Sequence, residues 1–474
     1  MKKTIIMSKI SLALFLSLLS INKLEAQISN WYGELKVQGT TLPITLEIDK
    51  RSDTTIIMMG SPAQTSEMFP ITKQRLEGDS ILFTIKPMGV VYRGEYNKDK
   101  TKIKGSFKQG LLVTDLEFEK KKEKFEIKRP QEPKPPYPYL EKELSFQTPG
   151  VDYTFNGTLT LPNENGKFPC VVLITGSGLQ NRDEEIMGHK PFKVIADYLT
   201  RQGIAVFRYD DRGWGSNNPE LMDANTYDYA KDAQNAINLL RNHPNIDKTK
   251  IGVIGHSEGG IIASIITSMD KDIAFAVLLA GTGMNGYEVL KQQTKEILQK
   301  EKASKDVINY QIQALDEIYR LIKENKTDEE ISKEMNSFFD KVYNSLSDKK
   351  RGDYQFSSKA ARTQFISQSS GKWMRCFMTL EPKDFLEKIN QPLLSIIGTK
   401  DIQVLYKYNM PAIEKAVLSS GNKNFEKYSA KNMNHLFQEC KKCTIGEYSE
   451  LEETFSPKVL TRIAEFIHKY SNIR

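Results

Sequence analysis

The chain has 474 residues, of which 39% are hydrophobic and 27% are charged. This length accommodates one large domain and at least one further module. The composition is that of an ordinary globular protein and excludes a collagen, a coiled coil or a wholly disordered chain. The formal net charge of +7 comes from basic residues interspersed with acids, so neither nucleic acid nor a membrane surface is indicated as a partner.

The first 26 residues have the pattern of a secretory signal peptide. Three lysines precede the apolar run 10–21, and Leu24-Glu25-Ala26 offers a cleavage site before Gln27. The alternative is an uncleaved anchor, but the run is short for a bilayer span. Cleavage would lower the formal charge from +7 to +4. We therefore expect a periplasmic or secreted bacterial protein with no stable membrane insertion after signal cleavage.

Residues 28–127 are predicted to form an all-β accessory domain. Alternating apolar and polar residues mark short strands separated by turn residues, at 42–48, 80–85, 90–96, 102–107 and 114–118. Such strands at near-regular spacing favour a small antiparallel barrel or sandwich. We expect a structural or substrate-positioning module, with an independent binding domain as the alternative.

A proline-rich segment at 128–140 follows this domain. Its core, Arg129–Pro138, contains five prolines, which enforce an extended backbone. It is predicted to be a stiff linker.

Residues 141–474 alternate between buried strands and helices. Continuous apolar runs predict parallel strands at 169–175, 203–209, 250–254, 274–279 and 392–397. Helical periodicity marks 191–202, 226–241, 259–269 and 456–470. This alternation is typical of a doubly wound, mostly parallel α/β sheet. The long interval at about 284–385 has helix-type spacing and predicts an inserted helical cap above the sheet, where substrate selection resides.

The four cysteines include the pair Cys440-Lys441-Lys442-Cys443. In an oxidising compartment this pair favours a local disulfide. Free thiols are the alternative, and a zinc site lacks a second ligand pair.

A nucleophile is indicated at Ser257, within Gly255-His256-Ser257-Glu258-Gly259. The pentapeptide lies between the buried strand 251–254 and a helix beginning near Gly259. This strand–turn–helix setting is the one that a nucleophile elbow requires.

A serine nucleophile needs a base, which an acid must orient. In a fold with this elbow the acid and then the histidine follow the serine in the chain. Of the five histidines, only His435 lies on a loop after the last strand pattern, at 424–429, so it is the predicted base. Asp401, at the end of a buried strand, is the predicted acid, and Asp384 is its rival.

Two backbone amides are predicted to bind the oxyanion. One is that of Glu258, at the start of the helix, and the other that of Ser177, in the loop Thr175-Gly176-Ser177-Gly178 after a strand. Gly178 and Arg182 are possible substrate-binding residues. For Arg182, and for Asp210-Asp211-Arg212-Gly213, pairing that braces a loop is the alternative.

Several segments resemble bacterial α/β-hydrolase carboxylesterases. They are TGSGLQNRDE (175–184), GHKPF (188–192), RYDDRGWGSN (208–217), GHSEGG (255–260), GTKD (398–401) and NHLFQ (434–438). The chain is more remotely similar to dienelactone hydrolases and to prolyl-oligopeptidase-type catalytic domains. The similarity spans about residues 140–474, and a small β domain precedes such hydrolases.

The resemblance implies an α/β-hydrolase fold and cleavage of small-molecule carboxylic esters through an acyl-enzyme, without metal or organic cofactor. Two alternatives remain. One is a secreted serine peptidase or aminopeptidase of related fold, and the other is a catalytically inert binding protein. The sequence does not indicate the oligomeric state, or the acyl and alcohol parts of the substrate.

Overall fold

A computed structural model describes residues 27–37, 40–50, 54–64, 67–110, 112–125, 127–216, 218–352 and 354–471. The predicted signal peptide lies outside these residues. Within them, no helix is both long and apolar enough to cross a bilayer. The chain divides into two compact units between Ile127 and Lys128, which are described separately below.

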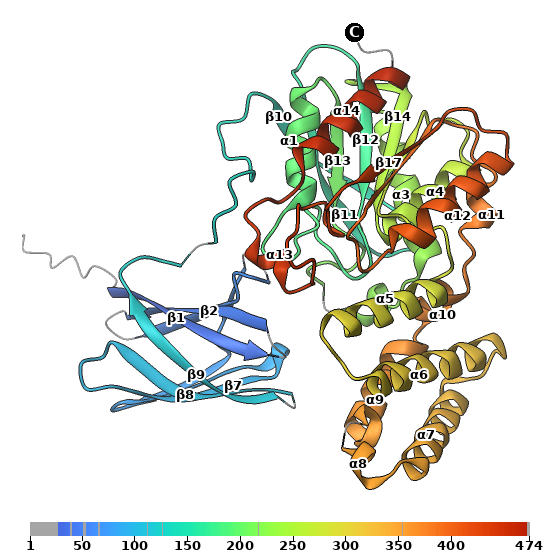
Figure 1. Cartoon of the computed structure of the whole chain (residues 1–474). Helices are drawn as coiled ribbons and strands as arrows, with labels where there is room; N and C mark the ends of the chain where they lie inside the picture. The colour runs from blue at the N-terminus through green and yellow to red at the C-terminus, as the bar shows by residue number, and fades with distance from the viewer. Residues whose placement is uncertain are drawn as a thin grey trace, which may run out of the picture. The chain divides into compact units, whose positions relative to one another are not determined.

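The first unit is one nine-stranded antiparallel sheet (Figure 1). Its strand order is β4-β3-β2-β1-β9-β8-β7-β6-β5. The sheet curls around a single core that includes Trp31, Phe83, Tyr92 and Phe118, so the barrel-like alternative applies rather than two packed sheets. The strands are β1 (Gln27–Val37), β2 (Thr40–Lys50), β3 (Thr55–Gly60), β4 (Met68–Pro70), β5 (Lys73–Glu77), β6 (Ser80–Ile85), β7 (Val90–Tyr96), β8 (Lys102–Gln109) and β9 (Leu112–Lys121), with a 3-10 turn η1 (Lys86–Met88).

The second unit contains an eight-stranded sheet in the order β10-β11-β13-β12-β14-β15-β16-β17. The pairs β10/β11 and β11/β13 are antiparallel, and every later pair is parallel. The strands are β10 (Leu140–Gln147), β11 (Thr154–Leu161), β12 (Phe168–Ile174), β13 (Ala205–Tyr209), β14 (Ile246–His256), β15 (Ala276–Leu279), β16 (Leu393–Gly398) and β17 (Phe425–Ala430). The inner strands β12, β15 and β16 and residues 251–255 of β14 are almost entirely apolar because helices cover both faces of the sheet.

Two helices cover one face of this sheet and three cover the other (Figure 1). α1 and α14 pack on one face, and α3, α4 and α12 pack on the opposite one. α3 begins with a capping box between Asn225 and Asp228, which satisfies amides that the helix leaves unpaired. The helices are α1 (Pro191–Arg201), α2 (Pro219–Met222), α3 (Thr226–Arg241), α4 (Glu258–Met269), α12 (Tyr406–Ser419), α13 (Glu447–Glu450) and α14 (Pro457–Ser471). This topology confirms the predicted α/β-hydrolase fold.

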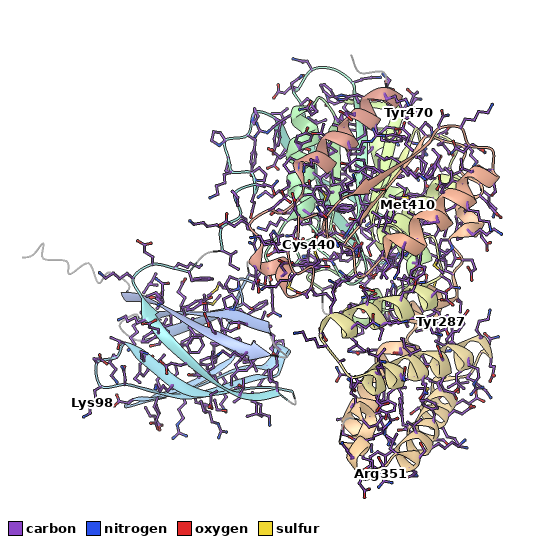
Figure 2. The ribbon with its side chains drawn as sticks, viewed as in Figure 1. Lys98, Tyr287, Arg351, Met410, Cys440 and Tyr470 are labelled. Atoms are coloured by element: carbon purple, nitrogen blue, oxygen red, sulfur yellow. A yellow bond between two sulfur atoms is a disulfide. The ribbon has the colours of Figure 1, made fainter. Side chains whose placement is uncertain are left out.

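A helical insertion separates β15 from β16 in the chain, and Figure 1 shows its helices α5 to α10. It has its own apolar core, which includes Ile318, Ile331, Met335 and Phe339. Figure 2 labels Tyr287 on its first helix and Arg351 at the end of α8. The elements are α5 (Gly286–Lys300), α6 (Lys305–Lys323), α7 (Asp328–Ser345), α8 (Asp348–Arg351), η2 (Gln355–Ser357), α9 (Lys359–Ser370), α10 (Lys372–Thr379) and α11 (Lys383–Leu386).

The proline-rich segment predicted to be a linker packs against the second unit. The guanidinium of Arg129 donates to the carbonyls of Met187, Gly188, Ser449 and Leu451. The segment is thus tied down at the start of the second unit.

Candidate active site

Ser257 lies at the turn between β14 and α4, near the centre of the sheet. Its backbone has φ 54° and ψ −117°, a conformation that costs energy and is found where a turn holds a functional side chain. A Cβ on Gly255 would lie 1.9 Å from the carbonyl oxygen of Gly259, and one on Gly259 would lie 2.2 Å from that of Ile174. The two glycines therefore allow the turn to be this tight.

Asp401 and His435 meet at the same edge of the sheet. Asp401 follows β16 and His435 follows β17, and these strands are parallel neighbours. Nδ1 of His435 lies 2.8 Å from Oδ2 of Asp401, and both residues are 5% exposed. The other carboxylate oxygen accepts the backbone N–H groups of Gln403 and Val404. Asp401 is therefore held by its own loop with one oxygen on the imidazole. The rival Asp384 lies in the short helix α11.

The two predicted oxyanion donors flank Ser257. Ser177 lies in the loop after β12, and β12 is the parallel neighbour of β14. As the first residue of α4, Glu258 has an N–H without a partner inside the helix. Both residues line the same cavity as Ser257.

The cavity has a volume of about 210 Å³. Ser257 and His435 lie in its wall, and the cap contributes residues of α5 and α10. Trp373 and Phe377 stack on each other, with ring centroids 5.1 Å apart. The lining residues are Gly176, Ser177, Gln180, Glu184, Ile186, His256, Ser257, Glu258, Thr282, Val289, Leu290, Gln293, Trp373, Phe377, Gln403, Val404, His435 and Leu436.

Arg182, predicted as a possible substrate contact, is engaged by protein groups. Its guanidinium pairs with Asp210 and Glu143 and donates to the hydroxyl of Thr158. It does not belong to the lining of the cavity, and neither does Gly178. The geometry favours the bracing alternative for Arg182.

The motif at 210–213 also braces loops. Asp211 accepts the hydroxyl of Thr175 and the backbone N–H of Gln180, while Arg212 pairs with the buried carboxylate of Asp232. The two bonds of Asp211 support the loop that carries Ser177, whereas the Arg212–Asp232 pair links the loop after β13 to α3.

Sequence reasoning missed the side chain of Glu258. It is 3% exposed, and its carboxylate accepts the hydroxyl of Thr226 at 2.7 Å and the indole N–H of Trp373 at 2.9 Å. Burial raises the pKa of this carboxyl, although hydrogen bonds from Thr226, Trp373 and Ser177 oppose the rise. The residue after the nucleophile therefore connects the elbow with helix α10 of the cap.

Glu184 and His256 were also missed. Both are buried at the cavity wall, and Nδ1 of His256 lies 2.9 Å from Oε1 of Glu184. Chain order excludes His256 as the base, because it lies within the elbow and not after the acid. The signal that could have found the pair is a carboxylate soon after the oxyanion loop, combined with a histidine next to the nucleophile.

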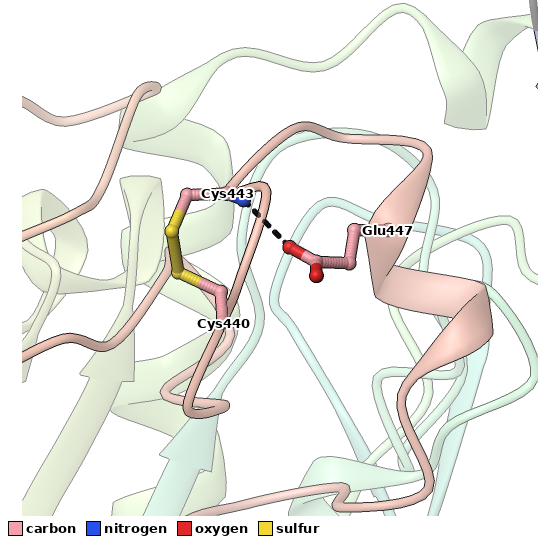
Figure 3. A group of neighbouring side chains, drawn as sticks. All are labelled: Cys440, Cys443 and Glu447. Atoms are coloured by element: carbon pink, nitrogen blue, oxygen red, sulfur yellow. Dashed lines mark hydrogen bonds between the residues drawn. A yellow bond between two sulfur atoms is a disulfide. The ribbon is translucent and has the colours of Figure 1, made fainter.

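Cys440 and Cys443 form a disulfide in the loop after His435 (Figure 3). With Glu447 they make the one cluster of potential metal ligands found among the described side chains. The sulfur atoms are bonded to each other, and the Glu447 carboxylate accepts the backbone N–H groups of Lys441, Lys442 and Cys443. The disulfide alternative applies, and these contacts close the loop behind the predicted base.

Fold and site together define the architecture of the α/β-hydrolase class. Residues 189–342 match the family model described as serine aminopeptidase, S33. The matched region contains Ser257 but ends before Asp401 and His435.

Proteins with similar sequence include an esterase and a thioesterase. Esterase EstD of Thermotoga maritima is 34% identical over 164 residues, which cover 33% of this chain and 37% of EstD. Mitochondrial acyl-coenzyme A thioesterase 2 of Rattus norvegicus is 31% identical over 148 residues, covering 30% and 29% of the two chains. The chain thus spans about a third of the length of these relatives.

Among solved structures, Est1E from Butyrivibrio proteoclasticus with bound ferulic acid aligns with a TM-score of 0.41 and 16% identity. The alignment covers 70% of this chain and all of that one.

Proposed function

We propose that this protein is a periplasmic or secreted serine esterase that cleaves carboxylic esters through an acyl-enzyme. One observation carries the proposal. Ser257, on a strained elbow, shares a cavity with His435, whose Nδ1 contacts the buried carboxylate of Asp401. The name of the relative EstD supports an ester as substrate, and the N-terminal leader pattern supports export.

In this mechanism Ser257 Oγ attacks the acyl carbonyl carbon, and its proton passes to Nε2 of His435. The Nδ1–H of His435 donates to Asp401, and this hydrogen bond leaves Nε2 free to act as the base. The Asp401 carboxylate also stabilises the imidazolium that forms. The amides of Ser177 and Glu258 donate to the oxyanion. His435 then protonates the leaving alcohol, and water repeats the sequence on the acyl-enzyme.

The cavity favours an uncharged ester. Among the described residues that line it, Glu184 and Glu258 are acidic and none is a lysine or arginine. A substrate carboxylate or phosphate inside the cavity would therefore lack a lysine or arginine to bind. The stacked rings of Trp373 and Phe377 offer an apolar wall for the acyl or alcohol group.

The test is hydrolysis of p-nitrophenyl esters of increasing acyl length. We expect turnover by the wild type, and a loss of kcat on the order of 10⁶ in Ser257→Ala and in His435→Ala. Near-normal turnover by Ser257→Ala would contradict the proposal.

A serine aminopeptidase is the second candidate. The description of the matching family model and the buried Glu258 carboxyl in the cavity, which could hold a free amine, favour it. Aminoacyl p-nitroanilides distinguish the two: hydrolysis of anilides in preference to simple esters would favour the peptidase.

A further inference from the structure

A second buried carboxylate–histidine pair lies beside the predicted base. His256 is 7% exposed and Glu184 is 3% exposed. The ring centroids of His256 and His435 are 4.8 Å apart. The proposed mechanism assigns no step to either Glu184 or His256.

Both ring nitrogens of His256 face oxygen atoms that accept hydrogen bonds. Nδ1 lies 2.9 Å from the Glu184 carboxylate, and Nε2 lies 3.1 Å from the backbone carbonyl of His435. A carbonyl oxygen can only accept, so Nε2 must carry a proton. A second proton must then lie between Nδ1 and Glu184, since otherwise two lone pairs would face each other. The pair therefore holds one proton more than a neutral imidazole beside a carboxylate.

Glu184 also connects this pair with the oxyanion loop. Its Oε1 accepts the backbone N–H of Gly176 at 2.7 Å, one residue before Ser177. A Cβ on Gly176 would lie 3.3 Å from both Glu184 Oε1 and the Cβ of Ser257. The loop is thus held between the carboxylate and the nucleophile.

We propose that Glu184 and His256 are positioning residues, acting as an imidazolium–carboxylate pair that fixes the His435 loop and the Ser177 loop around Ser257. The role rests on the proposed function, because it serves the same triad. His256 holds His435 through its backbone carbonyl, and Glu184 holds the oxyanion loop through Gly176. This buried pair thus fixes the positions of both the His435 loop and the oxyanion loop. Neither Asp401 nor the elbow glycines can do both.

The charges around the pair are consistent with a protonated ring. Burial lowers the pKa of His256, but the charge and hydrogen bond of Glu184 outweigh it, with smaller contributions from the His435 carbonyl and Asp401, so the pKa is raised. His435 also faces the ring. Asp211, in the loop after β13, is near enough to Glu184 that the Glu184 charge adds to burial in raising the pKa of Asp211. Because the pair exchanges a proton at its own pKa, its function should have an alkaline limit.

The test uses three variants of the pair: Glu184→Gln, His256→Gln and the double variant that carries both substitutions. Asp232→Asn is the control variant. Asp232 forms a buried ion pair with Arg212 and does not line the cavity, so it controls for the loss of a buried charge pair. Melting temperature, kcat, KM and the rate of fluorophosphonate labelling are measured from pH 5.5 to 9.

We expect Glu184→Gln to lower kcat about 10- to 100-fold, the cost typical of misplaced catalytic groups, with KM changed less than threefold. The alkaline limb of kcat should move to lower pH, because His256 loses the carboxylate that keeps it protonated. The kcat of the double variant should be no lower than that of the less active single variant, because each single substitution already disables the whole pair. Asp232→Asn should lower the melting temperature and leave kcat within twofold.

A folded Glu184→Gln protein with kcat within threefold of wild type and an unshifted pH profile would overturn the proposal. A wild type that neither hydrolyses esters nor labels would instead contradict the proposed function. In that case ¹⁵N NMR of the His256 ring still tests the imidazolium–carboxylate pair. Two protonated ring nitrogens at pH 7 support the pair, and a neutral ring overturns it.

Discussion

Lowering the pH should destabilise this protein through one buried histidine, His189. The side chain is fully buried, with Nδ1 2.9 Å from the hydroxyl of Thr454 and Nε2 2.8 Å from the carbonyl of Tyr448. Burial, together with the positive charge of Arg129, lowers the pKa of His189 from 6.5 to about 4. The folded protein therefore keeps this ring neutral where the unfolded chain protonates it.

The direction and the size of this loss of unfolding free energy follow from proton linkage. Because the folded pKa is depressed, the contribution of His189 is fully present above pH 6.5 and is lost as the pH falls toward 4. Between pH 7.5 and pH 5 this loss is about 2 kcal/mol. Urea unfolding at both pH values measures it, and His189→Gln provides the comparison, because that variant should lack this part of the pH dependence. An equal loss of unfolding free energy in wild type and variant would refute the reasoning.

Three further predictions concern the elbow, the cap and the disulfide. Gly259→Ala should destabilise the protein by at least about 2 kcal/mol, because its Cβ would meet the carbonyl of Ile174. Gly371→Ala, where the nearest atom is 3.9 Å away, should be tolerated, and equal stability of the two variants in urea unfolding would contradict this account. Trp373→Phe should lower kcat/KM about tenfold by removing the N–H that holds Glu258; unchanged ester kinetics would argue against the cap contact. Replacing Cys440 and Cys443 together by serine should cost about 2 kcal/mol, and an unchanged melting temperature, also under reducing conditions, would count against a stabilising disulfide.

The central strands of the second unit were predictable because helices cover them on both faces. β12, β16 and residues 251–255 of β14 are nearly uninterrupted apolar runs, which a parallel buried strand requires. The edge strand β10 alternates polar and apolar residues within LEKELSFQ and was not predicted. Its identity depends on pairing with β11, which is tertiary information.

The proposed triad could be read from chain order, whereas the residues that support it could not. Ser257, Asp401 and His435 each follow a predicted strand, and parallel strands bring their ends to one edge. Glu184 and His256 are 72 residues apart, and their contact depends on the path of a loop. The same holds for the contact of Trp373, in the cap, with Glu258. Loop paths and cap placement are determined by packing, which no local pattern records.

The central claim is that Ser257 is the nucleophile. The most direct measurement is fluorophosphonate labelling of the full chain followed by mapping of the modified peptide by mass spectrometry. We expect a single adduct on Ser257, which is lost in Ser257→Ala and forms much more slowly in His435→Ala. An adduct on another residue, or ester hydrolysis that persists in Ser257→Ala, would contradict it.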